Sequence, residues 1–119
     1  IGDLVAHDLI KETVQRYRPS HHIELSKQLK FVHNYRGGMF GFVSNHATNM
    51  SIVGVMVFLC LKKYYPKSWI YLSILVLIIS YSRIYLGVHY LSDIIGGWML
   101  GIILSISIFQ LSKITILKI

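Results

Sequence analysis

The chain has 119 residues, of which 54% are hydrophobic and 14% are charged, and its mean hydropathy is +0.55. This composition fits a membrane protein better than a soluble globule. The net charge is +7, but the cations form no continuous run. We therefore expect no nucleic acid partner, and a lipid headgroup or another phosphate-bearing partner instead. Cys60 is the only cysteine, which excludes an internal disulfide.

The first ten residues contain Asp3 and Asp8 and lack a basic start, so they do not have the pattern of a signal peptide. We expect them to be the end of a helix that begins upstream. Residues 11–46 are polar and are interrupted by Pro19 and three glycines, and aromatic side chains are interleaved with the cations. This pattern is typical of an interfacial loop on the headgroup layer, with one short helix expected at Ile23–Val32.

Three uncharged apolar segments follow, at 47–61, 68–82 and 94–112. The third has 19 residues and is long enough to cross about 30 Å of hydrocarbon as a helix. The first two have 15 residues each, and they can span if the lysines at their ends extend toward the headgroups. A soluble helix bundle is the alternative. Three such segments in succession favour an all-α membrane helical bundle with three transmembrane helices.

A hairpin of the first two segments would place His46 and Arg83 at one membrane face, together with Asp93 and residues 11–36. The opposite face would carry Lys62, Lys63, Lys67, Lys113 and Lys118. Seven Lys and Arg residues on the first face against five on the second favour a cytoplasmic site. If Lys11, Arg18 and Arg83 bind an anion and are left out of the count, four cations remain on the first face against five on the second. Charge alone therefore does not decide the orientation.

Three groups of residues on the first face could carry chemistry, and the first is Lys11 with Arg18 and Pro19. A turn at Pro19 can bring both cations around one anion, where arginine offers a planar fork and lysine a point charge. Interfacial anchoring would use the same two side chains.

The second group is Ser44, Asn45 and His46, which follow the glycine-rich stretch 36–41. A flexible loop that enters a helix leaves unpaired backbone N–H groups at the positive end of the helix dipole, which favours an anion. Helix capping is the competing explanation for Ser44 and Asn45. Capping does not explain His46.

The third group is Arg83, His89 and Asp93, which lie between the second and third apolar segments. If the chain is helical after Gly87, His89 and Asp93 share a face, and the carboxylate can fix the imidazole tautomer. The other ring nitrogen is then free to attack. An interfacial arginine with a capping His/Asp pair is the alternative.

Together these groups resemble the motifs of the type 2 phosphatidic acid phosphatase family, membrane phosphatases that share an active-site design with vanadium haloperoxidases. The family pattern is Lys-x6-Arg-Pro, then Pro-Ser-Gly-His, then Ser-Arg-x5-His-x3-Asp. The chain matches it at Lys11, Arg18, Pro19, Ser44, His46, Ser82, Arg83, His89 and Asp93. Val43 and Asn45 stand where the family has proline and glycine. Asn45 would be strained if its position required a positive φ.

The resemblance implies a metal-independent phosphatase that works through a phosphohistidine. His89 would attack phosphorus, Asp93 would orient it, and His46 would protonate the leaving oxygen and then activate water. The phosphate would be held by Lys11, Arg18, Ser44, Asn45 and Arg83. We expect no cofactor and no metal, because three fixed cations offset a phosphate that carries up to about −2.

The expected substrate is an amphiphile whose phosphate reaches the site while its tail stays in the bilayer. Members of the family act on phosphatidic acid, phosphatidylglycerol phosphate, polyprenyl diphosphates or phosphorylated lipid A. They usually have six spans, so we expect this chain to be an N-terminally truncated piece. In bacterial members the site generally faces away from the cytoplasm, so we expect a bacterial inner membrane protein with its site toward the periplasm or exterior. The alternatives are a non-catalytic or degenerate lipid-phosphate binder and, less favoured, a haloperoxidase; the oligomeric state stays open.

Overall fold

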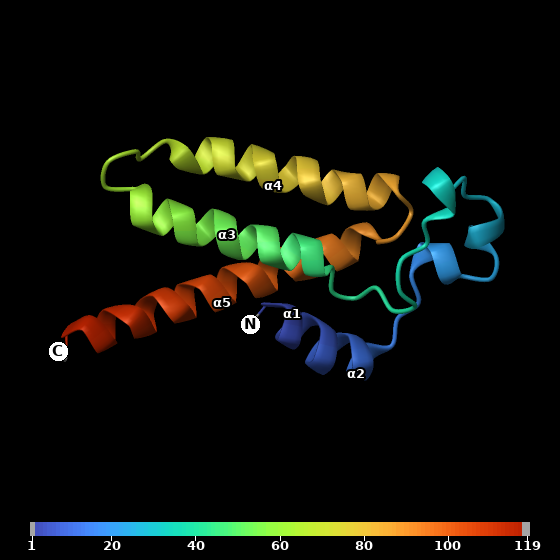
Figure 1. The fold of residues 1–119 in the computed structure, drawn as a ribbon, viewed down its shortest axis with the longest axis horizontal. Coiled ribbons are helices and arrows are strands. Elements are labelled where there is room, and N and C mark those ends of the chain that lie inside the picture. Colours follow the sequence, from blue (N-terminus) through green and yellow to red (C-terminus); the bar gives the residue numbers. More distant parts are fainter. Residues whose placement is uncertain (1, 118–119) are drawn as a thin grey trace.

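The structure, a computed structural model, describes residues 2–117, and in this range every regular element is helical (Figure 1). The all-helical class predicted from the sequence is therefore confirmed. Lys118, expected on the face opposite the site, lies outside the described residues. In chain order the elements are α1 (Gly2–Leu4), η1 (Val5–Lys11), α2 (Glu12–Val14), η2 (Pro19–His21), η3 (Leu25–Lys27), η4 (Val32–Asn34), α3 (Asn45–Leu61), α4 (Ser68–Tyr85) and α5 (Leu91–Leu117).

Helix α3 is the centre of the bundle, because both α4 and α5 pack against it (Figure 1). It forms an antiparallel hairpin with α4 through a short turn that contains Pro66. The start of α3, the end of α4 and the start of α5 consequently lie at one end of the bundle, beside the loop of residues 15–44. The turn between α3 and α4, with its lysines, lies at the other end.

Close contact between α3 and α5 depends on two glycines one helical turn apart, Gly97 and Gly101. A Cβ atom on Gly101 would lie 2.6 Å from the Thr48 carbonyl oxygen and 2.6 Å from the Ser51 Cβ. A Cβ atom on Gly97 would lie 2.8 Å from the Ser44 carbonyl oxygen. Small residues at this spacing let two helix backbones approach closely. In this chain the pair serves contact between two of its own helices.

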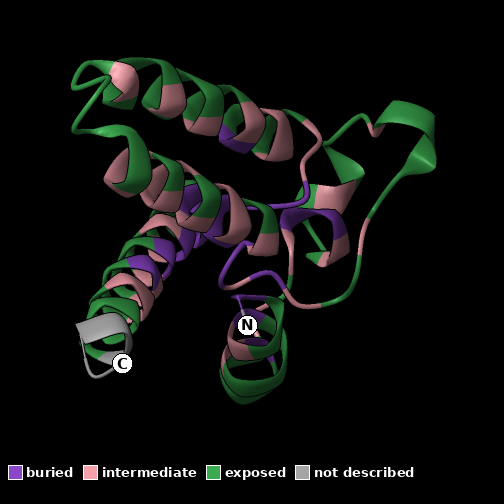
Figure 2. Cartoon of the chain, turned by 60° about the vertical axis from the view of Figure 1, so that its left-hand side comes forward, coloured by how far each residue is buried: buried purple, intermediate pink, exposed green. Residues whose placement is uncertain are grey.

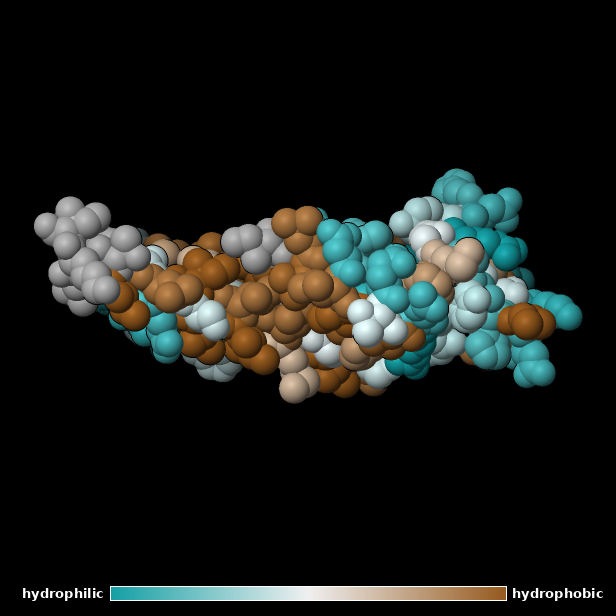
Figure 3. Space-filling view, turned by 90° about the horizontal axis from the view of Figure 1, so that it is seen from below, coloured by the Kyte–Doolittle hydropathy of each residue, from teal (hydrophilic) through white to brown (hydrophobic). Residues whose placement is uncertain are grey.

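The outer faces of the long helices are apolar and exposed. Helices α4 and α5 are long and apolar enough to cross a membrane, and α3 is a shorter apolar helix. Only 6% of the apolar window of α4 and 22% of that of α5 is buried within the chain, unlike the core helices of a soluble protein. Buried residues gather where α3, α5 and the loop meet (Figure 2). Figure 3 shows an apolar surface over the helices and a hydrophilic surface at the end with the loop.

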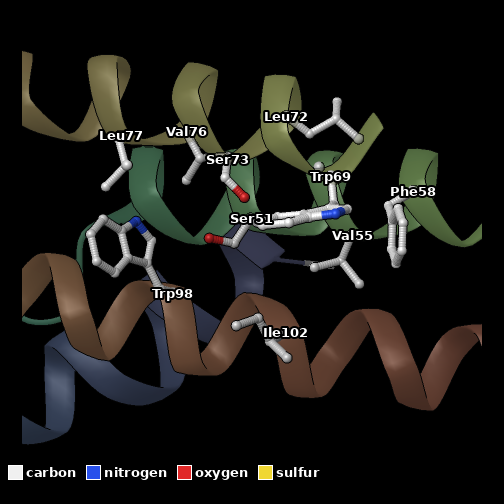
Figure 4. A pocket seen from close by; sticks show the side chains of 11 residues that line it. Ser51, Val55, Phe58, Trp69, Leu72, Ser73, Val76, Leu77, Trp98 and Ile102 are labelled. Atoms are coloured by element: carbon white, nitrogen blue, oxygen red, sulfur yellow. The ribbon is translucent and has the colours of Figure 1, made fainter. Parts of the chain in front are cut away.

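A cavity of about 300 Å³ lies among α3, α4 and α5 (Figure 4). Its walls are mainly apolar, and the indole of Trp98 reaches across it from α5 toward α4. Trp98 Nε1 donates a hydrogen bond of 3.0 Å to the buried Ser80 hydroxyl. This bond joins α4 to α5, which otherwise both rest on α3.

The N-terminal helical segment, α1 through α2, lies against α3 and places Lys11 at the site end of the bundle. Gly2 and Ala6 are buried, and Asp3 Oδ1 accepts hydrogen bonds from the side-chain amides of Asn45 and Asn49, at 2.9 and 3.0 Å. The segment ends at Gln15, whose φ of 49° cannot continue a right-handed helix. The irregular loop therefore begins at Gln15, later than the position of Lys11 predicted from the sequence.

The helix predicted at Ile23–Val32 is wrong. The helical structure of the loop is limited to single 3₁₀ turns, η2, η3 and η4, and His33 and Asn34 have positive φ values. Ile23 is 79% exposed and most of its neighbours up to Lys30 are exposed as well. A segment of this length is a marginal helix without tertiary packing, and here most of its side chains are exposed to solvent.

We expect Gly101→Ala to destabilise the bundle by about 1–3 kcal/mol, because the added methyl group meets backbone atoms of α3 that cannot move independently. Thermal unfolding in detergent micelles measures the effect. The matched control is Gly54→Ala, where the new Cβ would lie 3.3 Å from the movable Val76 side chain. Equal stability of the two variants would contradict the close packing of α3 on α5.

Candidate active site

The third sequence motif forms the link between α4 and α5. Gly87, with a φ of 67°, turns the chain after α4, and His89 follows before α5 begins at Leu91. His89 therefore precedes the helix, whereas the sequence pattern suggests a position within one. Asp93 lies in the first turn of α5, and its Oδ2 is 3.5 Å from His89 Nδ1. The two side chains face each other as predicted, although the local backbone differs and His89 Nδ1 makes no hydrogen bond among the described residues.

Asp93 is fully buried, and both of its carboxylate oxygens have partners. Oδ2 accepts a hydrogen bond of 2.9 Å from the Tyr90 backbone N–H, while the Asp93 N–H donates to the Tyr90 carbonyl at 3.0 Å. This reciprocal pair resembles a capping box and fixes the start of α5. Oδ1 accepts a hydrogen bond of 3.1 Å from Arg16 Nη1. The carboxylate therefore faces His89 on one side and Arg16 on the other.

His89 is only 3% exposed. Burial lowers the pKa of its imidazole below the ordinary value, the contact with Asp93 opposes this shift, and the charge of Arg18 adds to it. The imidazole is consequently neutral at neutral pH, as a nucleophile must be. Its Nδ1 faces Asp93 at a separation longer than a good hydrogen bond, and such contacts often tighten only when a ligand is bound.

Arg18 is held where the loop folds back on itself. The Arg18 backbone N–H donates to the Met39 carbonyl at 3.1 Å, the Gly41 N–H donates to the Arg16 carbonyl at 2.8 Å, and Arg18 Nε donates to the Phe40 carbonyl at 3.0 Å. A Cβ on Gly41 would lie 3.1 Å from both the Arg18 Cγ and the Asp93 Oδ2. Glycine at this position therefore allows the first and third motifs to lie side by side.

Lys11 and Arg18 line one cavity of about 290 Å³, together with Gly38, Met39, Phe40, His7 and Glu12. Its volume is at the lower end of ligand pockets, about 300–1,000 Å³. Lys11 is 4% exposed. Burial, assisted by the charge of Arg18, lowers the pKa of its ammonium from 10.5 to about 8. The two cations of the first motif thus face a shared space, as the sequence predicted.

The second motif begins α3. Ser44 is fully buried, its hydroxyl accepts from the Ala47 N–H at 3.5 Å, and its own N–H donates to the Asp93 carbonyl at 3.0 Å. The capping explanation therefore describes the Ser44 side chain in this structure. Asn45 is the first residue of α3 and is not a positive-φ position, so the strain considered from the sequence is absent there. Its side-chain amide turns toward Asp3, away from a phosphate.

His46 is in the first turn of α3, ahead of the apolar stretch, and stays accessible to solvent. Partial burial lowers the pKa of its imidazole, and the charges of Arg83 and Arg18 add to this effect. Arg83, at the end of α4, has a buried Nε atom without a hydrogen-bond partner among the described residues. Arg18 and Lys11 act electrostatically on both His46 and His89, so the two histidines border the same group of cations.

The structure thus brings together six of the eight side chains predicted for the site: Lys11, Arg18, His46, Arg83, His89 and Asp93. Ser44 and Asn45 are adjacent, but their side chains have other partners. The sequence motifs do not include Arg16, which is one of the seven cations on this face. Its position two residues before Arg18 is a signal that could have identified it, because alternate residues of an extended segment share a face.

Comparisons with known proteins identify the family to which the chain belongs. The model of the PAP2 superfamily matches residues 1–115. The lipid A 4'-phosphatase of Porphyromonas gingivalis is 37% identical over 111 residues, which cover 92% of this chain and 46% of that protein. The lipid A 4'-phosphatase of Bacteroides thetaiotaomicron is 36% identical over 104 residues, covering 84% of this chain and 44% of that protein.

A solved structure has the same fold. The crystal structure of the transmembrane PAP2 type phosphatidylglycerolphosphate phosphatase from Bacillus subtilis matches 94% of this chain and 54% of its own chain, with a TM-score of 0.67 and 23% sequence identity. The present chain spans about half the length of the relatives it matches. Nearly all of it is covered by the family model, and its helices match those of a transmembrane member. The chain is therefore that of an integral membrane protein and belongs to the PAP2 superfamily, as the motif resemblance predicted.

Proposed function

We propose that this protein hydrolyses the phosphate ester of a membrane lipid through a phosphohistidine intermediate. The observation that supports this most is that three groups lie at one end of an apolar bundle: the buried His89–Asp93 pair, the solvent-accessible His46, and three cations. A protein that only bound a lipid phosphate would need the cations but not two histidines of different exposure. This difference favours catalysis over the non-catalytic alternative.

In the first step His89 attacks phosphorus in line with the leaving oxygen. Its Nδ1 faces Asp93, so the attacking atom is Nε2. A P–N bond forms, the P–O bond to the lipid breaks, and the leaving oxygen takes a proton from His46. Asp93 holds the imidazole in the correct tautomer and stabilises the positive charge that the ring acquires.

In the second step His46, now neutral, removes a proton from water, and the resulting hydroxide attacks phosphorus. The P–N bond breaks, inorganic phosphate leaves, and His89 returns to its neutral form. The solvent access of His46 suits this exchange of protons with water, whereas the burial of His89 protects the intermediate. The two histidines therefore have environments that match two separate roles.

Lys11, Arg18 and Arg83 hold the phosphate oxygens as charge is redistributed in the transition state. The first backbone N–H groups of α3, at Asn45 and His46, have no partners within the helix, and they add donors at the positive end of its dipole. Ser44 contributes by fixing this helix start. These groups supply the charge that the reaction needs, so the proposed mechanism uses no metal or cofactor.

The substrate we propose is a lipid phosphate monoester, and phosphorylated lipid A is the first to test. Two relatives, at 37% and 36% identity, are lipid A 4'-phosphatases. Apolar helix surfaces meet the polar site end, so a headgroup can reach the cations while its acyl chains stay in the bilayer. We propose that this end faces the periplasm or exterior, by analogy with bacterial members of the family.

The reaction itself is tested by phosphate release from the intact protein in lipid micelles containing a chelator. We expect turnover of lipid A, with phosphatidylglycerol phosphate and phosphatidic acid as comparison substrates. His89→Asn should abolish release from all three, because it removes the buried imidazole that Asp93 orients for attack. The control is His21→Asn, a loop histidine outside the proposed site. Release by the folded His89→Asn protein would rule out its role as nucleophile.

If His89 is the nucleophile and His46 activates water in the second step, loss of His46 should trap the phosphohistidine intermediate. In His46→Asn, hydrolysis of the phosphoenzyme should slow more than its formation when the substrate has a good leaving group, such as an aryl phosphate. Acid-labile, base-stable labelling from a ³²P substrate should therefore accumulate in this variant, and addition of His89→Asn should remove it. A His46→Asn protein that turns over without any label would contradict the role of His46 in the second step.

Lys11 predicts how anion binding depends on pH. Below about pH 8 its ammonium is charged, and above this value it becomes neutral, so the inhibition constant for inorganic phosphate should rise steeply between pH 8 and 9. The lowered pKa of His46 keeps that ring uncharged throughout this range. Lys11→Arg should flatten the rise, because arginine stays charged. Lys30→Arg, a change on the exposed part of the loop, is the control and should leave the wild-type profile intact.

A further inference from the structure

Arg16 stands between Lys11 and Arg18 in the sequence, but its side chain contacts the start of α5. It does not line the cavity bounded by Lys11 and Arg18. Its Nη1 donates hydrogen bonds to Ser92 Oγ at 2.7 Å and to Asp93 Oδ1 at 3.1 Å, and its guanidinium carbon lies 4.4 Å from the centre of the Tyr90 ring. All three contacts are with residues at the start of α5, the segment that carries the partner of His89.

The backbone around Arg16 fixes this direction. The chain is extended here and pairs with residues 39–41 of the same loop, so Tyr17 and Phe40 form a β-bridge. Alternate side chains of an extended segment point to opposite faces. Tyr17 is 54% exposed and its ring lies against Phe40, while Arg16 and Arg18 face inward. One short segment thus sends one arginine to the ligand cavity and another to Asp93.

We propose that Arg16 is a positioning residue of the phosphatase reaction, which anchors Asp93 and thereby holds His89 in its attacking orientation. This inference rests on the proposed function. Asp93 is fully buried, and a buried carboxylate is costly unless it has a charged partner. Arg16 provides that partner at 3.1 Å, closer than the 3.5 Å to His89. Since Arg16 compensates the carboxylate, Asp93 can orient the imidazole without requiring it to be protonated.

Loss of Arg16 would change the balance of charges around His89. The charged groups that act on the imidazole are Asp93, Arg18 and Lys11, and Arg16 pairs with the same Asp93 carboxylate. Arg83 acts on Arg18 and on His46, the other titratable group at this end of the bundle. Without Arg16, the buried carboxylate would have His89 as its nearest cationic partner. The positively charged imidazole would then be favoured, and a larger fraction of the enzyme would carry a protonated, unreactive nucleophile.

The test compares Arg16→Gln, Arg16→Lys and a control, Arg36→Gln, in the intact protein, using lipid A phosphate release. Arg36 is an exposed arginine of the same loop that contacts only the Phe31 ring through its guanidinium, so its replacement removes the same charge without touching Asp93. We expect Arg16→Gln to lower kcat between about tenfold and a hundredfold with little change in KM, as with other residues that orient a catalytic ligand. The acid limb of the kcat/KM profile should move to higher pH.

Arg16→Lys should recover part of kcat, because an ammonium can pair with Asp93 but cannot reproduce the guanidinium contacts. Ser92→Ala, which removes one anchor of Arg16, should shift the acid limb in the same direction by less. If Arg16→Gln does not fold, these two variants carry the test. An unchanged kcat and pH profile would overturn the proposal, and so would a rise in KM alone, which would make Arg16 a phosphate ligand.

His89→Asn, measured in parallel, separates this inference from the proposed function. If His89→Asn retains activity, the proposed function fails. If His89→Asn is inactive while Arg16→Gln behaves as the wild type, the function stands and only the role of Arg16 is refuted.

Discussion

The buried carboxylate of Asp93 is the point on which the site depends. A charge removed from water must find partners within the protein, and Asp93 finds them on two separate segments: the loop, through Arg16, and the link before α5, through His89 and the Tyr90 N–H. Its own backbone carbonyl accepts the Ser44 N–H at the start of α3. One residue therefore ties the three sequence motifs together, although they are separated by long stretches of chain.

Small residues make this convergence possible. Gly41 leaves room for the side chains of Arg18 and Asp93 to approach the same backbone position. Gly97 and Gly101 let the backbone of α5 pack directly against the backbone of α3. The helices hold the motifs at fixed positions, and the loop then folds over them. Helix α3 thus carries His46 and the short link before α5 carries His89, whereas the three cations come from η1, the loop and α4.

Much of this could be predicted from the sequence, because the signals are local. Long apolar runs predict the helices, and the hairpin alone brings His46 and Arg83 to one end. The Arg16–Asp93 contact joins residues 77 positions apart and leaves no local pattern. The expected helix at Ile23–Val32 failed for the opposite reason: its apolar residues suggest a helix, but most of them are exposed to solvent. Side-chain roles at Ser44 and Asn45 also depended on partners that a single stretch of sequence does not reveal.

The arrangement of charge explains why such a site requires an anion. Arg16 is balanced by Asp93, but Lys11 and Arg83 both lie within electrostatic range of Arg18, and none of these three cations has a carboxylate at hydrogen-bond distance among the described residues. Burial lowers the pKa of Lys11, and repulsion by the charge of Arg18 adds to this effect. A phosphate group would relieve this repulsion, and most strongly when negative charge accumulates on its oxygens. The protein thus supplies the positive half of an ion cluster at the edge of an apolar bundle, and a lipid headgroup can supply the negative half without its tail leaving the membrane.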